Sequence, residues 1–361
     1  MGTIDLMIYL DNNATTAIDH QVLEAMMADF GPTPLNPSSA HAAGRKAKAL
    51  LQGARRTIAD CFGCSPSELI FTSGGSEGLT TCIQGLYRGG RILTTHMEHS
   101  SVLKTLEGLP VDYVALDSIE ESITDQTSLM VFSAANGETG SLADLAKISA
   151  LAEHHRVPLI VDGVALLGRA PLTLYPGITA MCFSGHKIHG PKGIGLIYLR
   201  RGVRIQPLIK GGGQEHSLRS GTENLAGALG MAKAIELIDP KHFEQIQRLR
   251  NRLEEGCSGI VNGTEPRTCN VSNLYFPGCD GEALLIALDQ AGICASHGSA
   301  CSSGALEPSH VLQAMGYSME RVRGSVRFSL SRLTTEAEID QTLDCLNQYG
   351  AGAKKGCLEH F

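Results

Sequence analysis

The chain has 361 residues, of which 43% are hydrophobic and 19% are charged, and its net charge is −7. This length exceeds the size at which one core usually stops growing, so two domains are expected. The negative charge and the absence of an apolar run of about 18 residues argue against a nucleic-acid-binding or membrane protein. Eleven cysteines without a framework spacing favour a reducing compartment, so we expect a cytoplasmic protein.

Short apolar, β-rich runs alternate with helical patterns through the first half of the chain. A helix is expected over 142–153, where Leu142, Leu145 and Ile148 recur at helical spacing. The alternation predicts an α/β fold with a mostly parallel seven-stranded sheet that is buried on both faces. The seven expected strands are 69–72, 91–95, 111–115, 129–133, 158–162, 180–183 and 195–199.

The pattern changes after the glycine-rich segment 211–215. A long helical stretch from about 222 to 254 is broken near Asp239-Pro240, and strands and helices are mixed beyond it, up to a last helix that begins near Thr334. We therefore expect a large domain over 15–239 and a smaller α+β domain formed by 1–14 and 240–361.

Polar clusters follow five of the expected strands. Ligands of open α/β sheets bind beyond the carboxyl ends of parallel strands, so these clusters predict one shared site. They are 73–76, 96–99, 136–138, Asp162 and 184–187.

Lys187 is the first candidate for the catalytic centre. It lies in Ser184-Gly-His-Lys-Ile-His-Gly190, directly after a buried strand. A lysine that is partly desolvated or crowded by other cations becomes nucleophilic near neutral pH, which suits Schiff-base chemistry. A surface lysine in a glycine-rich loop is the alternative reading of this segment alone.

Two further motifs allow both a functional and a structural reading. The turn Ser73-Gly-Gly-Ser76 joins a strand to a helix, where backbone N–H groups bind phosphate, although a plain tight turn is equally consistent. Asp162 ends an apolar strand, where a carboxylate needs a cation such as a protonated pyridine nitrogen. Helix capping or a structural ion pair would also explain it.

The histidine and cysteine motifs differ in what they indicate. His96 and His99 lack the spacing of a zinc helix, so no metal site is expected. Cys61 and Cys64 form an isolated pair without a redox-domain context. Cys301 lies in Gly298-Ser-Ala-Cys-Ser-Ser-Gly304, a small polar loop in which an exposed thiol could reach a substrate.

Together these segments resemble the NifS/IscS-like cysteine desulfurases, a class V, fold-type I family of pyridoxal-phosphate (PLP) enzymes. The resemblance covers nearly the whole chain and implies a fold-type I PLP-transferase fold. It rests on ordered matches at 9–16, 36–41, 71–77, 98–99, 138–140, 184–195, 211–222, 298–304 and 326–332.

The resemblance also implies a role for each matching residue. Lys187 would carry PLP as a Schiff base, His99 would stack on its ring, and Asp162 would pair with its ring nitrogen. Cys301 would be the nucleophile that takes up sulfur. The phosphate would be held by Gly75, Ser76, Ser184, His186 and, from the second subunit of a homodimer, Thr222. The substrate carboxylate would be held by Asn36 and Arg332.

The implied reaction converts L-cysteine to L-alanine and places sulfur on the enzyme as a persulfide. The sulfur would pass to an acceptor protein, whose identity the sequence does not give, for iron–sulfur cluster or thio-cofactor biosynthesis. Two alternatives stay open: a related PLP lyase resembling selenocysteine lyase, and a PLP-bound, weakly active partner or scaffold protein. No nucleic-acid or membrane partner is expected.

Three positions depart from the family pattern. The family has a second asparagine where this chain has Gly137, and a glutamine where it has Ala165; both side chains normally donate to the 3′ oxygen of PLP. Ser76 replaces a threonine and keeps the hydroxyl. Loss of two donors would change the turnover rate more than cofactor binding, because a covalent bond and the phosphate contacts also hold PLP.

Overall fold

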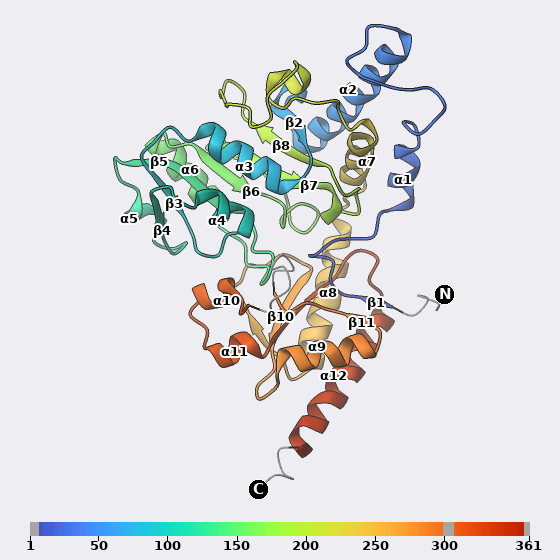
Figure 1. Cartoon of the computed structure of the whole chain (residues 1–361). Helices are drawn as coiled ribbons and strands as arrows, with labels where there is room; N and C mark the ends of the chain where they lie inside the picture. Colours follow the sequence, from blue (N-terminus) through green and yellow to red (C-terminus); the bar gives the residue numbers. More distant parts are fainter. Residues whose placement is uncertain (1–6, 299–306, 357–361) are drawn as a thin grey trace. The chain divides into compact units, whose positions relative to one another are not determined.

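The computed structural model describes residues 7–298 and 307–356, and it divides into two compact units (Figure 1). The sheet unit comprises 16–134 and 143–238, and the terminal unit comprises 1–15, 135–142 and 239–361. The short segment 135–142 thus interrupts the sheet unit in sequence. In the described ranges, no helix has both the length and the apolarity that crossing a membrane requires.

The sheet unit is built on one seven-stranded sheet of order β2-β8-β7-β6-β5-β3-β4. The predicted strands are confirmed. Four of the six strand pairings in this sheet are parallel, and only β8 runs antiparallel to the strands beside it, β2 and β7. The sheet is therefore mostly parallel. Its strands are β2 (Leu69–Thr72), β3 (Arg91–Thr94), β4 (Val111–Tyr113), β5 (Thr127–Ser133), β6 (Leu159–Asp162), β7 (Ile178–Ser184) and β8 (Gly195–Leu199).

Helices cover both faces of this sheet. On one face α3 (Gly75–Leu86) and α4 (Ser100–Leu106) bury Leu79, Ile83 and Val102 against the strands. Helix α6 (Leu145–His155) connects β5 to β6, and this step along the sheet is opposite in direction to the step from β2 to β3 that α3 connects. Because both connections are right-handed, α6 lies on the other face of the sheet (Figure 1). The remaining helices of the unit are α1 (His20–Met26), α2 (Ala42–Phe62), α5 (Ile119–Ser122) and α7 (Leu225–Glu236).

The strand directions bring the carboxyl ends of six strands, β2 to β7, to one edge of the sheet. The strands β3, β5, β6 and β7 are parallel, and β2 points the same way because β8 lies antiparallel between β2 and β7. At this edge Ser133 pairs with Asp162, and Ser184 pairs with Gly195 at the start of β8. Of the five expected polar clusters, four lie in the sheet unit at this edge, whereas 136–138 belongs to the terminal unit.

The terminal unit has the α+β character that the sequence predicts. Its antiparallel sheet has the order β12-β10-β9, and its second sheet is the parallel pair β1 and β11. Leu274, Val326 and Phe328 of the sheet are fully buried in the core of the unit. The strands are β1 (Ile8–Tyr9), β9 (Ile260–Asn262), β10 (Val271–Tyr275), β11 (Ile293–Cys294) and β12 (Ser325–Ser329); the helices are α8 (Lys241–Gly256), α9 (Gly281–Gln290), α10 (His310–Ala314), α11 (Met319–Arg323) and α12 (Glu336–Gly356).

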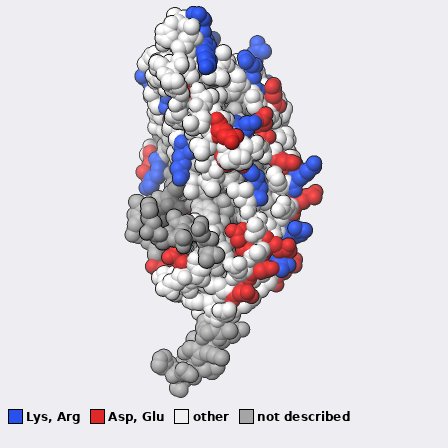
Figure 2. All heavy atoms as spheres, turned by 90° about the vertical axis from the view of Figure 1, so that its right-hand side faces the viewer, with Lys and Arg blue, Asp and Glu red and all other residues white. Residues whose placement is uncertain are grey.

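The predicted break of the long helical stretch lies between α7 and α8, where Pro240 is the N-cap residue of α8. Basic and acidic side chains are interspersed on the face of the molecule in Figure 2. This mixture suits the ordinary surface that the composition indicates.

Candidate active site

Lys187 lies at the edge of the sheet where the polar strand ends meet. It ends the 3₁₀ turn η2 (Gly185–Lys187), which follows the completely buried strand β7. The backbone of the turn is held in place because the carbonyl of His186 accepts hydrogen bonds from both the N–H and the hydroxyl of Thr16, each at 2.9 Å. The side chain of Lys187 is half-buried. A strand end and a fixed turn therefore set the position of the amine.

Asp162 provides a buried carboxylate close to that amine. The residue is only 6% exposed, and burial raises the pKa of its carboxyl group. The Val164 N–H, which donates to Oδ1 at 2.9 Å, and the positive charges of His99 and Lys187 oppose this rise in pKa. A hydrogen bond from its own turn and nearby positive charges thus act together on Asp162, which does not cap any of the described helices.

Arg169 connects these two positions and was missed by the sequence reasoning. Its guanidinium is buried and donates to the carbonyl of Lys187 at 3.0 Å and to that of Val164 at 3.4 Å. It thereby ties the turn after Asp162 to the turn that carries Lys187. The sequence signal was weak, because an arginine seven residues after a strand end is more often a surface residue.

His99 is the N-cap residue of α4 and is exposed. Its Nδ1 accepts a hydrogen bond from the Ser101 N–H at 3.1 Å and lies 2.7 Å from the Ser101 hydroxyl. Nδ1 must keep its lone pair to accept this bond, so the proton of the neutral ring lies on Nε2. The cap thus fixes both the orientation and the tautomer of the imidazole.

Glu98 forms a second buried carboxyl group beside Asp162. It is 2% exposed and accepts hydrogen bonds from the hydroxyls of Thr95, at 2.7 Å, and Ser133. Burial raises its pKa to about 7, the two hydroxyls lower it, and the nearby Asp162 raises it further. Sequence reasoning treated this residue only as part of a motif. Its burial could not be deduced from the sequence, because it depends on Ser133, which donates to Glu98 and pairs with Asp162 in the sheet.

Replacing Glu98 by glutamine should flatten the pH dependence of stability in the protein without cofactor. The folded pKa of about 7 lies above the reference value of 4.5, so the stabilisation linked to the proton is complete below about pH 4.5 and is lost as pH rises through about 7. The expected loss is on the order of 3 kcal/mol in the wild type and is absent in Glu98→Gln. Urea unfolding of both proteins at about pH 5 and pH 8 measures it, and parallel pH profiles would contradict the assignment.

The turn between β2 and α3 forms a small cradle at the same edge. Helix α3 begins at Gly75, and its N-cap residue Gly74 offers no side-chain hydrogen bond to the helix N-terminus. A Cβ atom at Gly195 would lie only 2.5 Å from the backbone of Gly74, and one at Gly75 would lie 3.8 Å from Cβ of Ser184. Backbone N–H groups and the buried Ser184 thus share a compact site that suits an anion.

His186 borders this cradle as a neutral imidazole. Partial burial, followed by the positive charges of Lys187, Lys192 and Arg169, lowers its pKa to about 4. The neutral ring can still donate one N–H to an anion. Three lysine and arginine side chains around it make the local potential positive.

The other predicted residues are not all brought to this site by the described structure. Ser76, Asn36 and Thr222 are exposed residues of the sheet unit, and Asn36 closes its own turn by accepting the Ser38 N–H. Arg332 is half-buried and follows β12 in the terminal unit. Cys301 lies outside the described residues.

Comparison with known proteins gives a consistent result. Residues 8–342 match the model of the family described as "Aminotransferase class-V". The chain is 42% identical to "Cysteine desulfurase 2" of Trichormus variabilis, over 94% of this chain and 92% of that protein. It is 37% identical to "Cysteine desulfurase NifS" of Azotobacter vinelandii, over 93% and 90%. A solved "NIFS-LIKE PROTEIN" superposes with a TM-score of 0.88 at 33% identity, over 95% of this chain and 99% of the other.

Proposed function

We propose, from the premise that this chain belongs to the aminotransferase class-V family, that it is a cysteine desulfurase: it takes sulfur from L-cysteine and leaves L-alanine. Relatives of that name align over more than nine tenths of the chain. The observation in the structure that carries the proposal is the buried carboxylate of Asp162 beside Lys187 and His99. The amine of Lys187, the imidazole of His99 and the negative charge of Asp162 thus lie at one edge of the sheet, and the chemistry of the family needs all three groups.

The residues of the sheet unit fit PLP, the cofactor that the family implies. The buried carboxylate of Asp162 suits a protonated ring nitrogen, which would offset the cost of its burial. The glycine cradle at α3, with Ser184, Ser76 and the neutral His186, suits the phosphate. Lys187 supplies the amine for covalent attachment. We therefore assign PLP to this site, with Thr222 of a second subunit completing the phosphate contacts in a homodimer.

Each polar group then has a distinct task. Bound PLP supplies an electron sink that makes the Cα–H of the amino acid acidic. The amine of Lys187 would move the Cα proton of the substrate. His99 would take up the thiol proton of the substrate on Nδ1, in exchange for its hydrogen bond from the Ser101 N–H, because Nε2 of the neutral ring already carries a proton. Asp162 holds the proton on the ring nitrogen. Arg169 keeps Lys187 and the Asp162 turn in register.

Sulfur transfer is assigned to Cys301. Its thiolate forms a new S–S bond with the sulfur of the substrate while the C–S bond of the substrate breaks. The bonding electrons stay with the carbon fragment, which takes up protons and leaves as L-alanine. Arg332 and Asn36 would hold the substrate carboxylate, since a guanidinium binds carboxylate with two parallel hydrogen bonds. An acceptor protein then receives the sulfur for iron–sulfur cluster or thio-cofactor biosynthesis in the cytoplasm.

The purified protein with added PLP tests the proposal directly. We expect a visible absorbance band of bound cofactor, and equal amounts of L-alanine and transferred sulfur from L-cysteine in the presence of a thiol reductant. A protein that stays colourless after incubation with PLP would refute the assignment of the site. A coloured protein that releases no alanine would refute the activity.

One alternative retains a specific observation in its favour. The chain has no side-chain donor at Gly137 or Ala165, which favours a PLP-bound protein of low activity that serves as a partner. A lyase resembling selenocysteine lyase is less consistent with the sequence, because an enzyme that releases its product directly needs no persulfide carrier such as Cys301. Turnover with L-cysteine and with L-selenocysteine separates the three.

The double variant Gly137→Asn/Ala165→Gln should restore the donors to the 3′ oxygen of PLP. Gly137 does not have a positive φ, so its backbone accepts a side chain. Donors that stabilise negative charge on this oxygen compete with the proton of the Lys187 linkage, so that proton should be lost at lower pH. We expect a lower transition pH of the visible band and a change in turnover of about tenfold or more. An unchanged transition pH would mean that another group already donates there.

A further inference from the structure

An acidic residue lies in the turn that forms the phosphate cradle. Glu77 belongs to the first turn of α3, and its side chain is 10% exposed. Its Oε2 accepts the N–H of Ser73 at 2.8 Å and thereby closes the turn between β2 and α3. The carboxylate shapes the cradle, but its negative charge opposes the binding of an anion there.

Arg219 supplies the compensating positive charge. Its Nε donates to Oε1 of Glu77 at 3.0 Å, although the two residues are 142 positions apart in the chain. Burial raises the pKa of Glu77, whereas the hydrogen bonds from Arg219 and Ser73 and the charge of Arg219 lower it, and the net shift is downward. Glu77 is therefore ionised at neutral pH, and Arg219 offsets a charge that the cradle would otherwise carry.

Arg219 belongs to the loop 211–222, which contains an unusual backbone turn. Glu215, His216 and Ser217 all have a positive φ, of 46°, 59° and 64°. Residues other than glycine rarely adopt this left-handed region, and those held in it cluster at functional sites. Three such residues in a row require contacts that hold the loop in this conformation.

Glu215 anchors the loop to β2. Its two carboxylate oxygens accept hydrogen bonds from the guanidinium of Arg55 in α2 at 2.6 and 2.9 Å, and both side chains are only 2% exposed. Oε2 of Glu215 also accepts the N–H of Phe71 in β2 at 2.9 Å. The loop therefore contacts this part of the sheet unit at two points: Glu215 binds the strand that precedes the cradle, and Arg219 binds the cradle turn through Glu77.

The backbone beside Arg219 is fixed as well. The next residue, Ser220, is 5% exposed, and its hydroxyl donates to the carbonyl of Gly212 at 2.8 Å. On the other side of Arg219, the N–H of Leu218 donates to the carbonyl of Glu215 at 3.0 Å. A surface ion pair needs no such support, because its two side chains usually contribute little. The guanidinium is thus directed to Glu77 from a loop that is held on both sides.

We infer that Arg219 is a positioning residue for the phosphate of PLP: it neutralises Glu77 in the cradle and holds the cradle turn to the loop 211–222. The inference rests on the proposed function, since it takes the cradle as the phosphate site. Loss of the guanidinium would leave the charge of Glu77 uncompensated, so binding of the phosphate should weaken. Removal of both charges together should restore much of this binding.

Binding of PLP and of pyridoxal, which has the same aldehyde but no phosphate, isolates this effect. Protein freed of cofactor is titrated with each compound, and the visible band gives the two dissociation constants. In Arg219→Gln we expect the dissociation constant for PLP to rise about tenfold and that for pyridoxal to change by less than about twofold. Because the effect is electrostatic, the loss for PLP should shrink when the salt concentration is raised from about 0.05 M to about 0.5 M.

The double variant Glu77→Gln/Arg219→Gln distinguishes a charge effect from simple loosening of the loop. It lacks both charges, and the amide oxygen at position 77 can still accept the Ser73 N–H. We expect its dissociation constant for PLP to lie within about threefold of the wild-type value. Arg219→Lys keeps the positive charge, should also stay within about threefold, and serves as the second variant if Arg219→Gln folds poorly.

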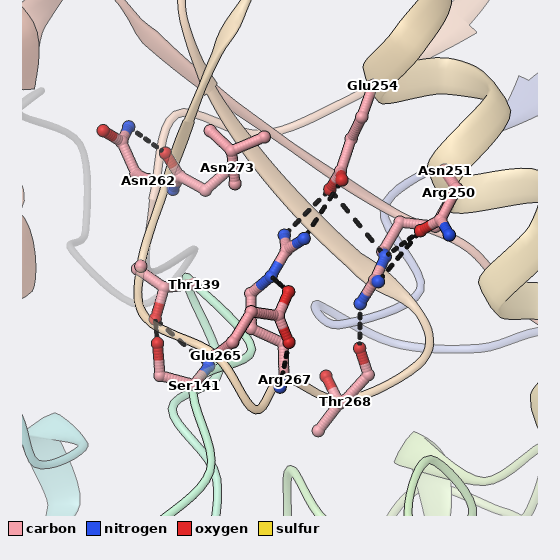
Figure 3. Close-up of polar contacts among 12 residues, drawn as sticks. Thr139, Ser141, Arg250, Asn251, Glu254, Asn262, Glu265, Arg267, Thr268 and Asn273 are labelled. Atoms are coloured by element: carbon pink, nitrogen blue, oxygen red, sulfur yellow. Dashed lines mark hydrogen bonds and ion pairs between the residues drawn. The ribbon is translucent and has the colours of Figure 1, made fainter.

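A matched control comes from the terminal unit, where Arg267 forms an ion pair with a glutamate (Figure 3). Arg267 donates to both carboxylate oxygens of Glu254 in α8, at 2.8 and 3.0 Å, and its side chain is 6% exposed. Arg267→Gln thus removes an arginine from a buried ion pair outside the sheet unit. It should lower the midpoint of urea unfolding, and the ratio of the two dissociation constants should stay as in the wild type.

An unchanged ratio of the two dissociation constants in Arg219→Gln would overturn the inference. So would a double variant that binds PLP as weakly as Arg219→Gln, because the arginine would then act only through the packing of the loop. These titrations need no turnover, so an absence of alanine release would refute the desulfurase activity without affecting them. A wild type that binds PLP no better than pyridoxal would instead refute the phosphate site itself.

Discussion

Lys187→Ala should lose the visible absorbance of covalently held PLP and all measurable turnover of L-cysteine, a fall of about a thousandfold or more. The reason is positional: the η2 turn after β7 presents the amine of Lys187 to the carboxylate of Asp162, and Arg169 holds the carbonyl of Lys187 in place. An amine from solution lacks this placement. Absorbance spectra with added PLP, and alanine release from L-cysteine, measure the two losses.

Lys192→Ala is the matched control for this variant. Lys192 belongs to the same loop and is exposed, and its charge, with those of Lys187 and Arg169, lowers the pKa of His186. We expect it to keep the visible band and most of the turnover. A Lys187→Ala protein that retains the band, or a Lys192→Ala protein that loses it, would assign the cofactor linkage to the wrong lysine.

The sheet could be predicted from the sequence because its strands are short apolar runs that end in polar clusters. Leu159–Asp162 and Ile178–Ser184 are buried along their whole length, which is the pattern of strands covered on both faces. The direction of β8 could not be predicted in this way. An apolar run such as Gly195–Leu199 carries no signal of direction, and only its pairing with β2 and β7 reveals that it is antiparallel.

The site residues that belong to a local sequence motif could be predicted, whereas those whose role depends on contacts with distant parts of the chain could not. Lys187, Asp162 and Ser184 follow strands directly, so the topology of the sheet was enough to bring them to one edge. Glu98 and Arg219 depend instead on particular partners, Ser133 in one case and Glu77 in the other. Those pairs join residues 35 and 142 positions apart in the chain. No local pattern encodes such contacts.

Cys301→Ser should keep bound PLP and Cα–H exchange of L-alanine, yet lose persulfide formation from L-cysteine by about a hundredfold or more. A serine hydroxyl is far less nucleophilic toward sulfur than a thiolate, and the deprotonation at Cα relies on other groups. Burial raises the pKa of Cys61, of Cys294 and, to about 11, of Cys64. These thiols therefore hold little thiolate at neutral pH and are poor substitutes for Cys301.

Cys64→Ser serves as the control and should form persulfide at close to the wild-type rate. Mass spectrometry of the labelled protein locates the sulfur. Persulfide found on Cys61, Cys64 or Cys294, together with full activity of Cys301→Ser, would show that the role given to Cys301 is wrong. Persulfide confined to Cys301 in the wild type and absent from the variant would support one nucleophile, because the reaction needs a thiolate and burial raises the pKa of Cys61, Cys64 and Cys294.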